Sequence, residues 1–121
     1  METKTAFEKY IFITFQKEGI HKFPGAVNFP GVEFLANDHR HMFHFRVEIE
    51  VKHDDRDIEF ILFKRELEQQ YESGALQLDY KSCEMMCDDL YKYIKEHYKG
   101  RFLNITVSED GENGAIAHYH T

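Results

Sequence analysis

The feature of this sequence that most constrains the fold is the alternation of side chains over residues 41–51, HMFHFRVEIEV. Successive side chains of a β-strand point to opposite faces of a sheet. The apolar positions are Phe43, Phe45, Val47, Ile49 and Val51, and the polar positions are His44, Arg46, Glu48 and Glu50. A period of two therefore predicts a strand with one face in the core and one polar face.

Three further segments have the composition of strands. Residues 7–21 contain the aromatic and β-branched run YIFITF, which is typical of a half-buried strand. Residues 102–107, FLNITV, and 115–120, AIAHYH, predict two more strands joined by a turn. Residues 22–37 contain both prolines of the chain and predict a loop.

Two helices are expected between the second and third of these strands. From about residue 60 the apolar side chains follow a spacing of three and four, which predicts a helix that ends at Ser73-Gly74. Ser82 is the expected N-cap of a second helix, which ends at Gly100. The order β-β-α-α-β-β predicts one α+β domain over residues 1–121: a four-stranded antiparallel sheet with two helices on one face.

The composition indicates a folded, acidic protein. Hydrophobic residues make up 42% of the 121 residues and aromatic residues 15%, as in a globule with one core. The net charge of −7 argues against nucleic acid as a partner. No apolar run approaches the ~20 residues that a bilayer span needs, and the charged start METKTAFEKY lacks the apolar core of a signal peptide. We therefore expect a cytoplasmic protein without membrane contact, whose partner is a small molecule or a protein.

Three histidines are expected to converge at one end of the sheet. His21 closes the first predicted strand, and His39 and His41 open the second. If these strands pair as a hairpin, all three imidazoles lie together, because two histidines one residue apart on a strand point the same way. Three neutral ring nitrogens and an open fourth position form the usual pattern of a catalytic zinc site. The sequence thus predicts zinc bound by three histidines.

Chance is the alternative explanation for this histidine pattern. A chain with eight histidines will often contain two that are one residue apart. His44 lies on the polar face of the same strand and is expected to be a solvated or an interface histidine. His118 and His120 share a face of the last predicted strand and could belong to a pocket or to the solvent.

Four segments, in order along the chain, resemble the motifs of one enzyme family. FQKEGIHKFP (15–24) is similar to F-x-A-A-H-R-L-P, and HRHMF (39–43) to H-G-H-x-Y/F. IEFILFK (58–64) looks like I-D-F-x-x-L-K, and VSEDGENGAI (107–116) has the spacing of V-x-E-T-x-x-x-G-x-I. Together they resemble the family of the 6-pyruvoyl- and 6-carboxy-tetrahydropterin synthases, over nearly the whole chain.

The resemblance implies a fold, a site and an assembly. The fold would be the tunnelling fold, in which subunits join edge to edge as a trimer or hexamer, with sites between neighbours. His21, His39 and His41 would be the zinc ligands. Glu109 would bind the amino-pyrimidine edge of a pterin or guanine, because a carboxylate accepts two parallel hydrogen bonds from such an edge. Without the resemblance, Glu109 is simply a solvated turn residue.

The chain also departs from the family's pattern. The catalytic cysteine of the family corresponds to Leu35, and its L-D-H segment is matched by Leu78-Asp79-Tyr80, with tyrosine in place of histidine. Asp79 is therefore the candidate catalytic residue, or else a loop acid before the second helix. Cys83 and Cys87, four residues apart, are expected to be buried thiols of that helix in a reducing compartment.

Three functions follow from these patterns. The leading hypothesis is a zinc-dependent enzyme that acts on a pterin- or purine-like small molecule by lyase or hydrolase chemistry, with His44, His118, His120 or Asp79 as the base. The second is a non-catalytic module that captures a purine nucleotide, a pterin or a protein partner. The third is a structural oligomer with a fortuitous histidine cluster. The family's proton relay of cysteine, aspartate and histidine cannot be assembled from the equivalent residues, which favours the second hypothesis. The three retained histidines favour the first.

Overall fold

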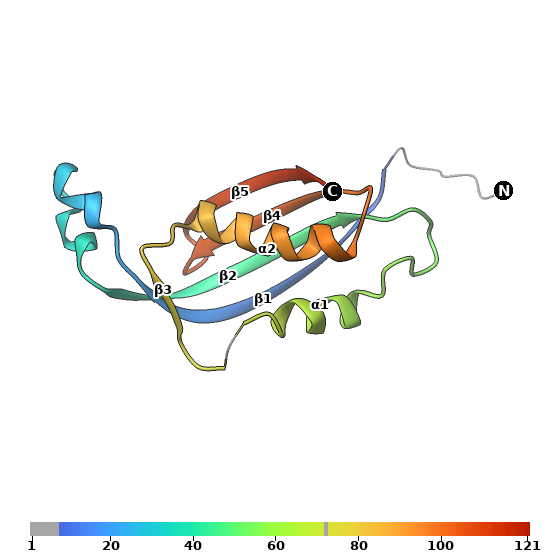
Figure 1. The fold of residues 1–121 in the computed structure, drawn as a ribbon, viewed down its shortest axis with the longest axis horizontal. Coiled ribbons are helices and arrows are strands. Elements are labelled where there is room, and N and C mark those ends of the chain that lie inside the picture. Colours follow the sequence, from blue (N-terminus) through green and yellow to red (C-terminus); the bar gives the residue numbers. More distant parts are fainter. Residues whose placement is uncertain (1–7, 72) are drawn as a thin grey trace.

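The computed structural model describes residues 8–71 and 73–121, and Figure 1 shows their arrangement. Five strands form one sheet in the order β3-β1-β2-β4-β5, and two α-helices lie against it. Two short 3-10 helices occupy the loop between the first two strands. The elements are β1 (Tyr10–His21), η1 (Pro24–Asn28), η2 (Glu33–Ala36), β2 (His39–Glu50), α1 (Phe60–Glu68), β3 (Leu76–Asp79), α2 (Cys83–His97), β4 (Phe102–Glu109) and β5 (Asn113–His120).

The predicted four-stranded antiparallel sheet is wrong, although the α+β class agrees with the structure. The additional strand, β3, lies between the two helices in the sequence and pairs parallel to β1, so the sheet is mixed. The order of elements is therefore β-β-α-β-α-β-β. The sequence patterns predict no strand between the two helices, where residues 76–79 form a short segment without β-branched side chains. Its strand conformation comes from pairing with residues 19–21 of β1.

The hairpin of β1 and β2 confirms the predicted pairing across the loop. Both strands have twelve residues, and their antiparallel register runs from Tyr10 opposite Glu50 to His21 opposite His39. Gly19 is opposite His41 in the same register. The far end of β1 and the start of β2 thus form one end of the sheet, which carries the three histidines.

Both helices contribute to a single core on one face of the sheet. Ser82 caps α2 as predicted, since its Oγ atom accepts a hydrogen bond from the Met85 backbone N–H at 3.2 Å. Helix α1 buries Phe63 and Leu67 but leaves Phe60 exposed, and it ends at Glu68, before the predicted stop. The strands bury Ile13, Phe15, Phe43, Phe45, Val47, Ile49, Leu103, Ile105 and Val107, and α2 buries Cys83, Met86, Cys87, Leu90 and Ile94. Both cysteines are free thiols in this core, as expected.

The opposite face of the sheet carries a mixture of apolar and polar side chains. Phe12, Phe102 and Ile116 are exposed on it. The guanidinium carbon of Arg46 lies 4.0 Å from the centre of the Phe12 ring, a cation–π contact. His44, His118 and His120 also lie on this face, as the strand register requires. These three histidines are therefore on the other side of the sheet from His21, His39 and His41.

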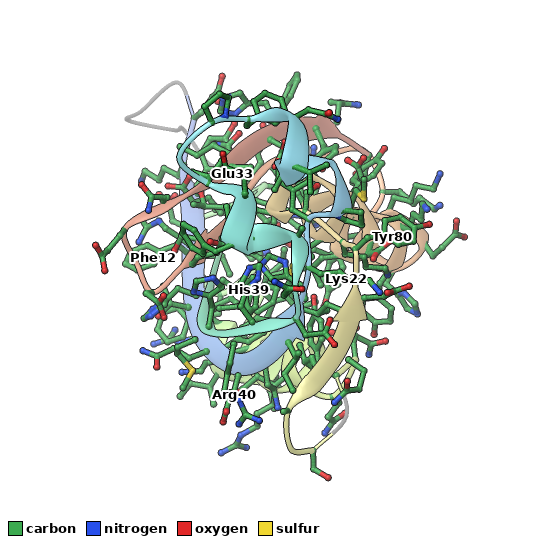
Figure 2. All side chains as sticks on the ribbon, turned by 90° about the vertical axis from the view of Figure 1, so that its left-hand side faces the viewer. Phe12, Lys22, Glu33, His39, Arg40 and Tyr80 are labelled. Atoms are coloured by element: carbon green, nitrogen blue, oxygen red, sulfur yellow. The ribbon has the colours of Figure 1, made fainter. Side chains whose placement is uncertain are left out.

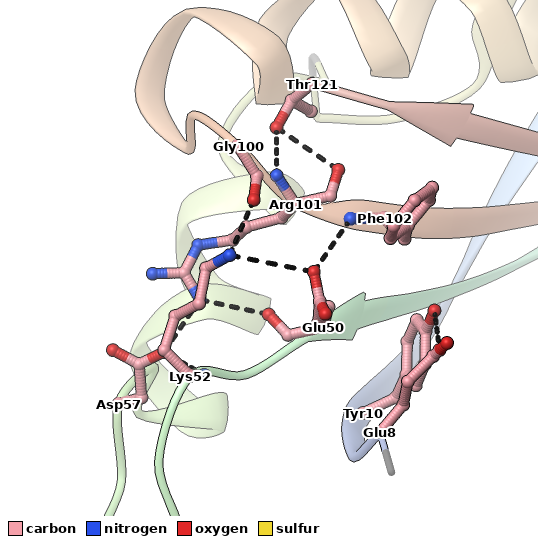
Figure 3. Close-up of polar contacts among 9 residues, drawn as sticks. All are labelled: Glu8, Tyr10, Glu50, Lys52, Asp57, Gly100, Arg101, Phe102 and Thr121. Atoms are coloured by element: carbon pink, nitrogen blue, oxygen red, sulfur yellow. Dashed lines mark hydrogen bonds and ion pairs between the residues drawn. The ribbon is translucent and has the colours of Figure 1, made fainter.

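A cluster around Arg101 ties the other end of the sheet to the loop before α1 (Figure 3). The Arg101 guanidinium donates to the Glu50 carbonyl at 2.9 Å and to the Asp57 carboxylate at 2.7 Å. The backbone N–H of Lys52 also donates to Asp57, at 2.7 Å. The hydrogen bond from Arg101 lowers the pKa of Asp57, and burial opposes this shift in part.

No α-helix in the part of the chain that the structure describes is long and apolar enough to cross a bilayer.

Candidate metal centre

The three predicted histidines form one group at the end of the β1–β2 hairpin. One ring nitrogen from each of His21, His39 and His41 lies within 4.8 Å of the others, so the group could hold a metal ion. His21 is only 6% exposed, whereas the other two are partly buried. Figure 2 views the molecule from this end: His39 lies near the centre, below the η1–η2 loop, with Lys22 and Tyr80 to one side. The predicted convergence is confirmed.

The hydrogen bonds of the rings determine which nitrogen is free to bind an ion. The Nδ1 atom of His21 lies 2.9 Å from the Lys81 carbonyl oxygen, and that of His39 lies 2.9 Å from the Asn37 carbonyl oxygen. A carbonyl oxygen only accepts hydrogen bonds, so Nδ1 carries the proton in both rings. In a neutral imidazole the other nitrogen, Nε2, then presents a lone pair. Metal-binding histidines are commonly fixed in this way.

Two of the Nε2 atoms are buried and have no hydrogen-bond partner. Among residues 8–71 and 73–121, the buried side-chain polar atoms without a hydrogen-bond partner are Nε2 of His21 and Nε2 of His41. The Glu109 carboxylate faces both, at 3.1 Å from His21 and 3.4 Å from His41. Lone pairs and a carboxylate facing one another in a buried site repel, unless a cation lies among them. The donor set therefore fits a bound cation.

A cavity of about 240 Å³ opens beside the histidine group. Phe23, Leu35 and Tyr80 line it, so both positions at which the chain departs from the resembled pattern border this space. Glu109 also lines it, which brings the predicted ligand-binding residue to the histidines. The full lining is His21, Lys22, Phe23, Leu35, His39, Tyr80, Lys81, Ser82, Cys83, Glu84, Glu109, Asn113 and Gly114.

Asp79 does not line this cavity. It ends β3, in the left-handed region with φ of 54°, and its carboxylate lies 3.5 Å from the ammonium group of Lys22. Its carbonyl oxygen accepts the backbone N–H of Lys22 at 2.7 Å. Asp79 is thus the strand partner of His21 in the β1–β3 pairing, but its carboxylate pairs with Lys22 and does not line the cavity.

Sequence reasoning missed two residues of the site. Cys83, expected only as a core thiol, also lines the cavity, and burial raises its pKa to about 12, so the thiol stays protonated at neutral pH. Asp110 contacts His41, with 2.7 Å between the carboxylate oxygen and Nδ1. Hydrogen bonds from the Met42 backbone N–H and from His41 hold the pKa of Asp110 below its usual range. The Asp-Gly turn that places Asp110 has no sequence signal that points to a histidine.

No family model and no curated protein sequence matches this chain. The resemblance to the tetrahydropterin synthases therefore rests on the four similar segments alone, and the site rests on its own geometry.

Proposed function

We propose that this chain is a zinc-binding relative of the tetrahydropterin synthases that binds, and acts on, a pterin- or purine-like small molecule. One observation carries the proposal. Three imidazoles converge with their Nδ1 atoms hydrogen-bonded to oxygen acceptors, and two of the opposing Nε2 atoms are buried without a partner. This is the state in which histidines bind a divalent metal.

Zinc suits this donor set better than the harder cations. Imidazole nitrogen is a preferred zinc ligand, whereas calcium and magnesium select sites built from oxygen. Three histidines leave a fourth position, which opens toward the cavity in this proposal. Zinc bound there would polarise an oxygen atom of the ligand.

The cavity supports a flat ligand that carries N–H groups. Glu109 offers two carboxylate oxygens to an N–H/NH2 edge, as pterins and guanines present. Phe23 and Leu35 offer an apolar surface to the ring. The ring edge would be held by Glu109, and an oxygen of the ligand would face the zinc.

Ligand capture without turnover is a second candidate function. Leu35 and Tyr80 line the cavity at the positions where the family has cysteine and histidine, so the equivalent residues do not supply that family's proton relay of cysteine, aspartate and histidine. Loss of a positioned acid or base typically costs about 10²–10⁴-fold in rate. We therefore expect no useful formation of carboxy- or pyruvoyl-tetrahydropterin.

Elemental analysis of protein purified without a histidine tag tests the metal. We expect about one zinc per chain, loss of zinc in His39→Ala, and unchanged zinc in His53→Ala, a control in the loop between β2 and α1, at the other end of the sheet. Metal-free wild-type protein would contradict the proposal.

Incubation of the zinc form with dihydroneopterin triphosphate, followed by calorimetric titration with guanine- and pterin-containing ligands, then separates catalysis from capture. Absence of both product and binding would leave a zinc site with a ligand of another class.

A further inference from the structure

The His41 ring is held between the carboxylates of two consecutive residues. Glu109 lies on the Nε2 side, at 3.4 Å, and Asp110 on the Nδ1 side, at 2.7 Å. The Glu109 carboxylate also contacts Nε2 of His21, so the Nε2 side of His41 faces the histidine group and Asp110 lies on the other side of the ring. Asp110 is therefore outside the ion-binding group, yet it contacts one of its members directly.

The backbone of the β4–β5 turn fixes the Asp110 carboxylate in place. Asp110 has φ of 56°, a left-handed conformation that aspartate adopts more readily than most residues. Its backbone N–H donates to the Met42 carbonyl at 2.7 Å, and its Oδ1 atom accepts the Met42 N–H at 2.9 Å. Its other oxygen, Oδ2, is the one that reaches His41. Three hydrogen bonds thus determine where this carboxylate lies.

We propose that Asp110 is the positioning residue of the metal site: it keeps the proton of His41 on Nδ1 and directs the Nε2 lone pair at the ion. His21 and His39 use backbone carbonyls for the same purpose, so only His41 depends on a side chain. A carboxylate also makes the ring a stronger donor to a metal than a carbonyl does. The inference rests on the metal site proposed above and adds a residue to it.

The alternative is a purely structural role, in which Asp110 only stabilises the turn through its hydrogen bonds to Met42. Asp110→Ala removes both side-chain hydrogen bonds. Asp110→Asn keeps the shape but has a single acceptor oxygen, so it can accept from His41 or from the Met42 N–H and not from both, and it serves as the intermediate variant. Glu112→Gln is the matched control, because it removes one negative charge from an exposed residue of the same turn.

The test combines zinc affinity with the tautomer of His41. Competition with a chelator should show about 10–100-fold weaker zinc binding in Asp110→Ala, a smaller loss in Asp110→Asn and none in Glu112→Gln. NMR of the ring nitrogens in the metal-free protein, at a pH where imidazole is neutral, should show His41 protonated on Nδ1 in the wild type and a mixture of tautomers in Asp110→Ala. If Asp110→Ala does not fold, the zinc affinity of Asp110→Asn and the His41 tautomer of the wild type still test the role of Asp110.

Two results would overturn the inference. One is folded Asp110→Ala that binds zinc as tightly as the wild type, and the other is wild-type His41 protonated on Nε2. Wild-type protein that binds no zinc would instead refute the proposed function, and the tautomer measurement would still report on Asp110 independently.

Discussion

A carboxylate oxygen of Glu109, at the end of β4, lies 3.1 Å from Nε2 of His21, at the end of β1. The two strands are not neighbours, because β2 lies between them. The contact therefore crosses over β2. The other oxygen of the same carboxylate lies 3.4 Å from Nε2 of His41, which belongs to β2. Glu109 lies at the boundary between the histidine group and the cavity, so it can serve the ligand, the ion or both.

Substitution of Glu109 separates these roles. In Glu109→Gln one acceptor oxygen becomes an NH2 donor, which leaves one N–H of the ligand facing another. We predict that zinc content is unchanged and that affinity for guanine- or pterin-containing ligands falls about tenfold or more, as for a lost hydrogen bond to a charged group. Calorimetric titration measures the affinity, with Glu112→Gln as the control. Loss of zinc would identify Glu109 as a fourth metal ligand, and unchanged ligand affinity would remove it from ligand binding.

The histidine group could be predicted from the sequence because strand geometry leaves few choices. Side chains on a strand alternate with a fixed period of two, so pairing of β1 with β2 brings His21, His39 and His41 to the same face and the same end. Likewise the alternation after His41 predicts the buried face of β2, and Ser82 predicts the start of α2. In each case the signal is local or depends on one hairpin.

Strand β3 and the role of Asp110 could not be predicted in the same way. Strand β3 has four residues and owes its conformation to a parallel partner distant in sequence. The contact between Asp110 and His41 depends on the backbone conformation of a turn, and the amino-acid sequence of that turn does not specify this conformation. Both features arise from tertiary structure that local propensity does not encode.

Gly19 shows how closely β3 approaches the hairpin. A Cβ atom at this position would lie 2.7 Å from Cδ1 of Leu78 and 2.8 Å from Cε2 of Phe43. We predict that Gly19→Ala destabilises the fold by about 1–3 kcal/mol, the usual cost of overpacking a core. Urea denaturation measures the change, and Gln16→Ala, on the exposed face of the same strand, is the control. Unchanged stability would mean that β3 moves away freely.

The edges of the sheet predict self-association. In the described part of the chain, β5 pairs only with β4, and β3 covers only residues 19–21 of β1. Unpaired edges of this length expose rows of N–H and C=O groups, which natural proteins usually cover. We predict a cyclic oligomer, a trimer or a hexamer, in light scattering at micromolar concentration. A monomer at that concentration would contradict this prediction and would place the whole ligand site within one chain.

The contact between Arg101 and Asp57 predicts how stability depends on pH. The side chains are only 15% and 14% exposed, and Asp57 accepts hydrogen bonds from both Arg101 and the Lys52 backbone. The pKa of Asp57 is lowered in the folded state, whereas an unfolded aspartate has a pKa of about 3.9. The stabilisation is therefore complete above the unfolded pKa and is lost as the pH falls through the lowered folded value.

We predict that Asp57→Asn lowers the free energy of unfolding by about 1–3 kcal/mol at neutral pH, because it leaves the Arg101 guanidinium without its charged partner. The difference from the wild type should shrink as the pH falls below the ordinary aspartate pKa, since the wild-type carboxylate then becomes protonated too. Denaturation curves across this acidic range measure both effects. Asp55→Asn is the control, because that side chain is 83% exposed and pairs with the neighbouring Arg56. A difference between Asp57→Asn and the wild type that stays constant down to low pH would show that the carboxylate charge contributes nothing to the contact.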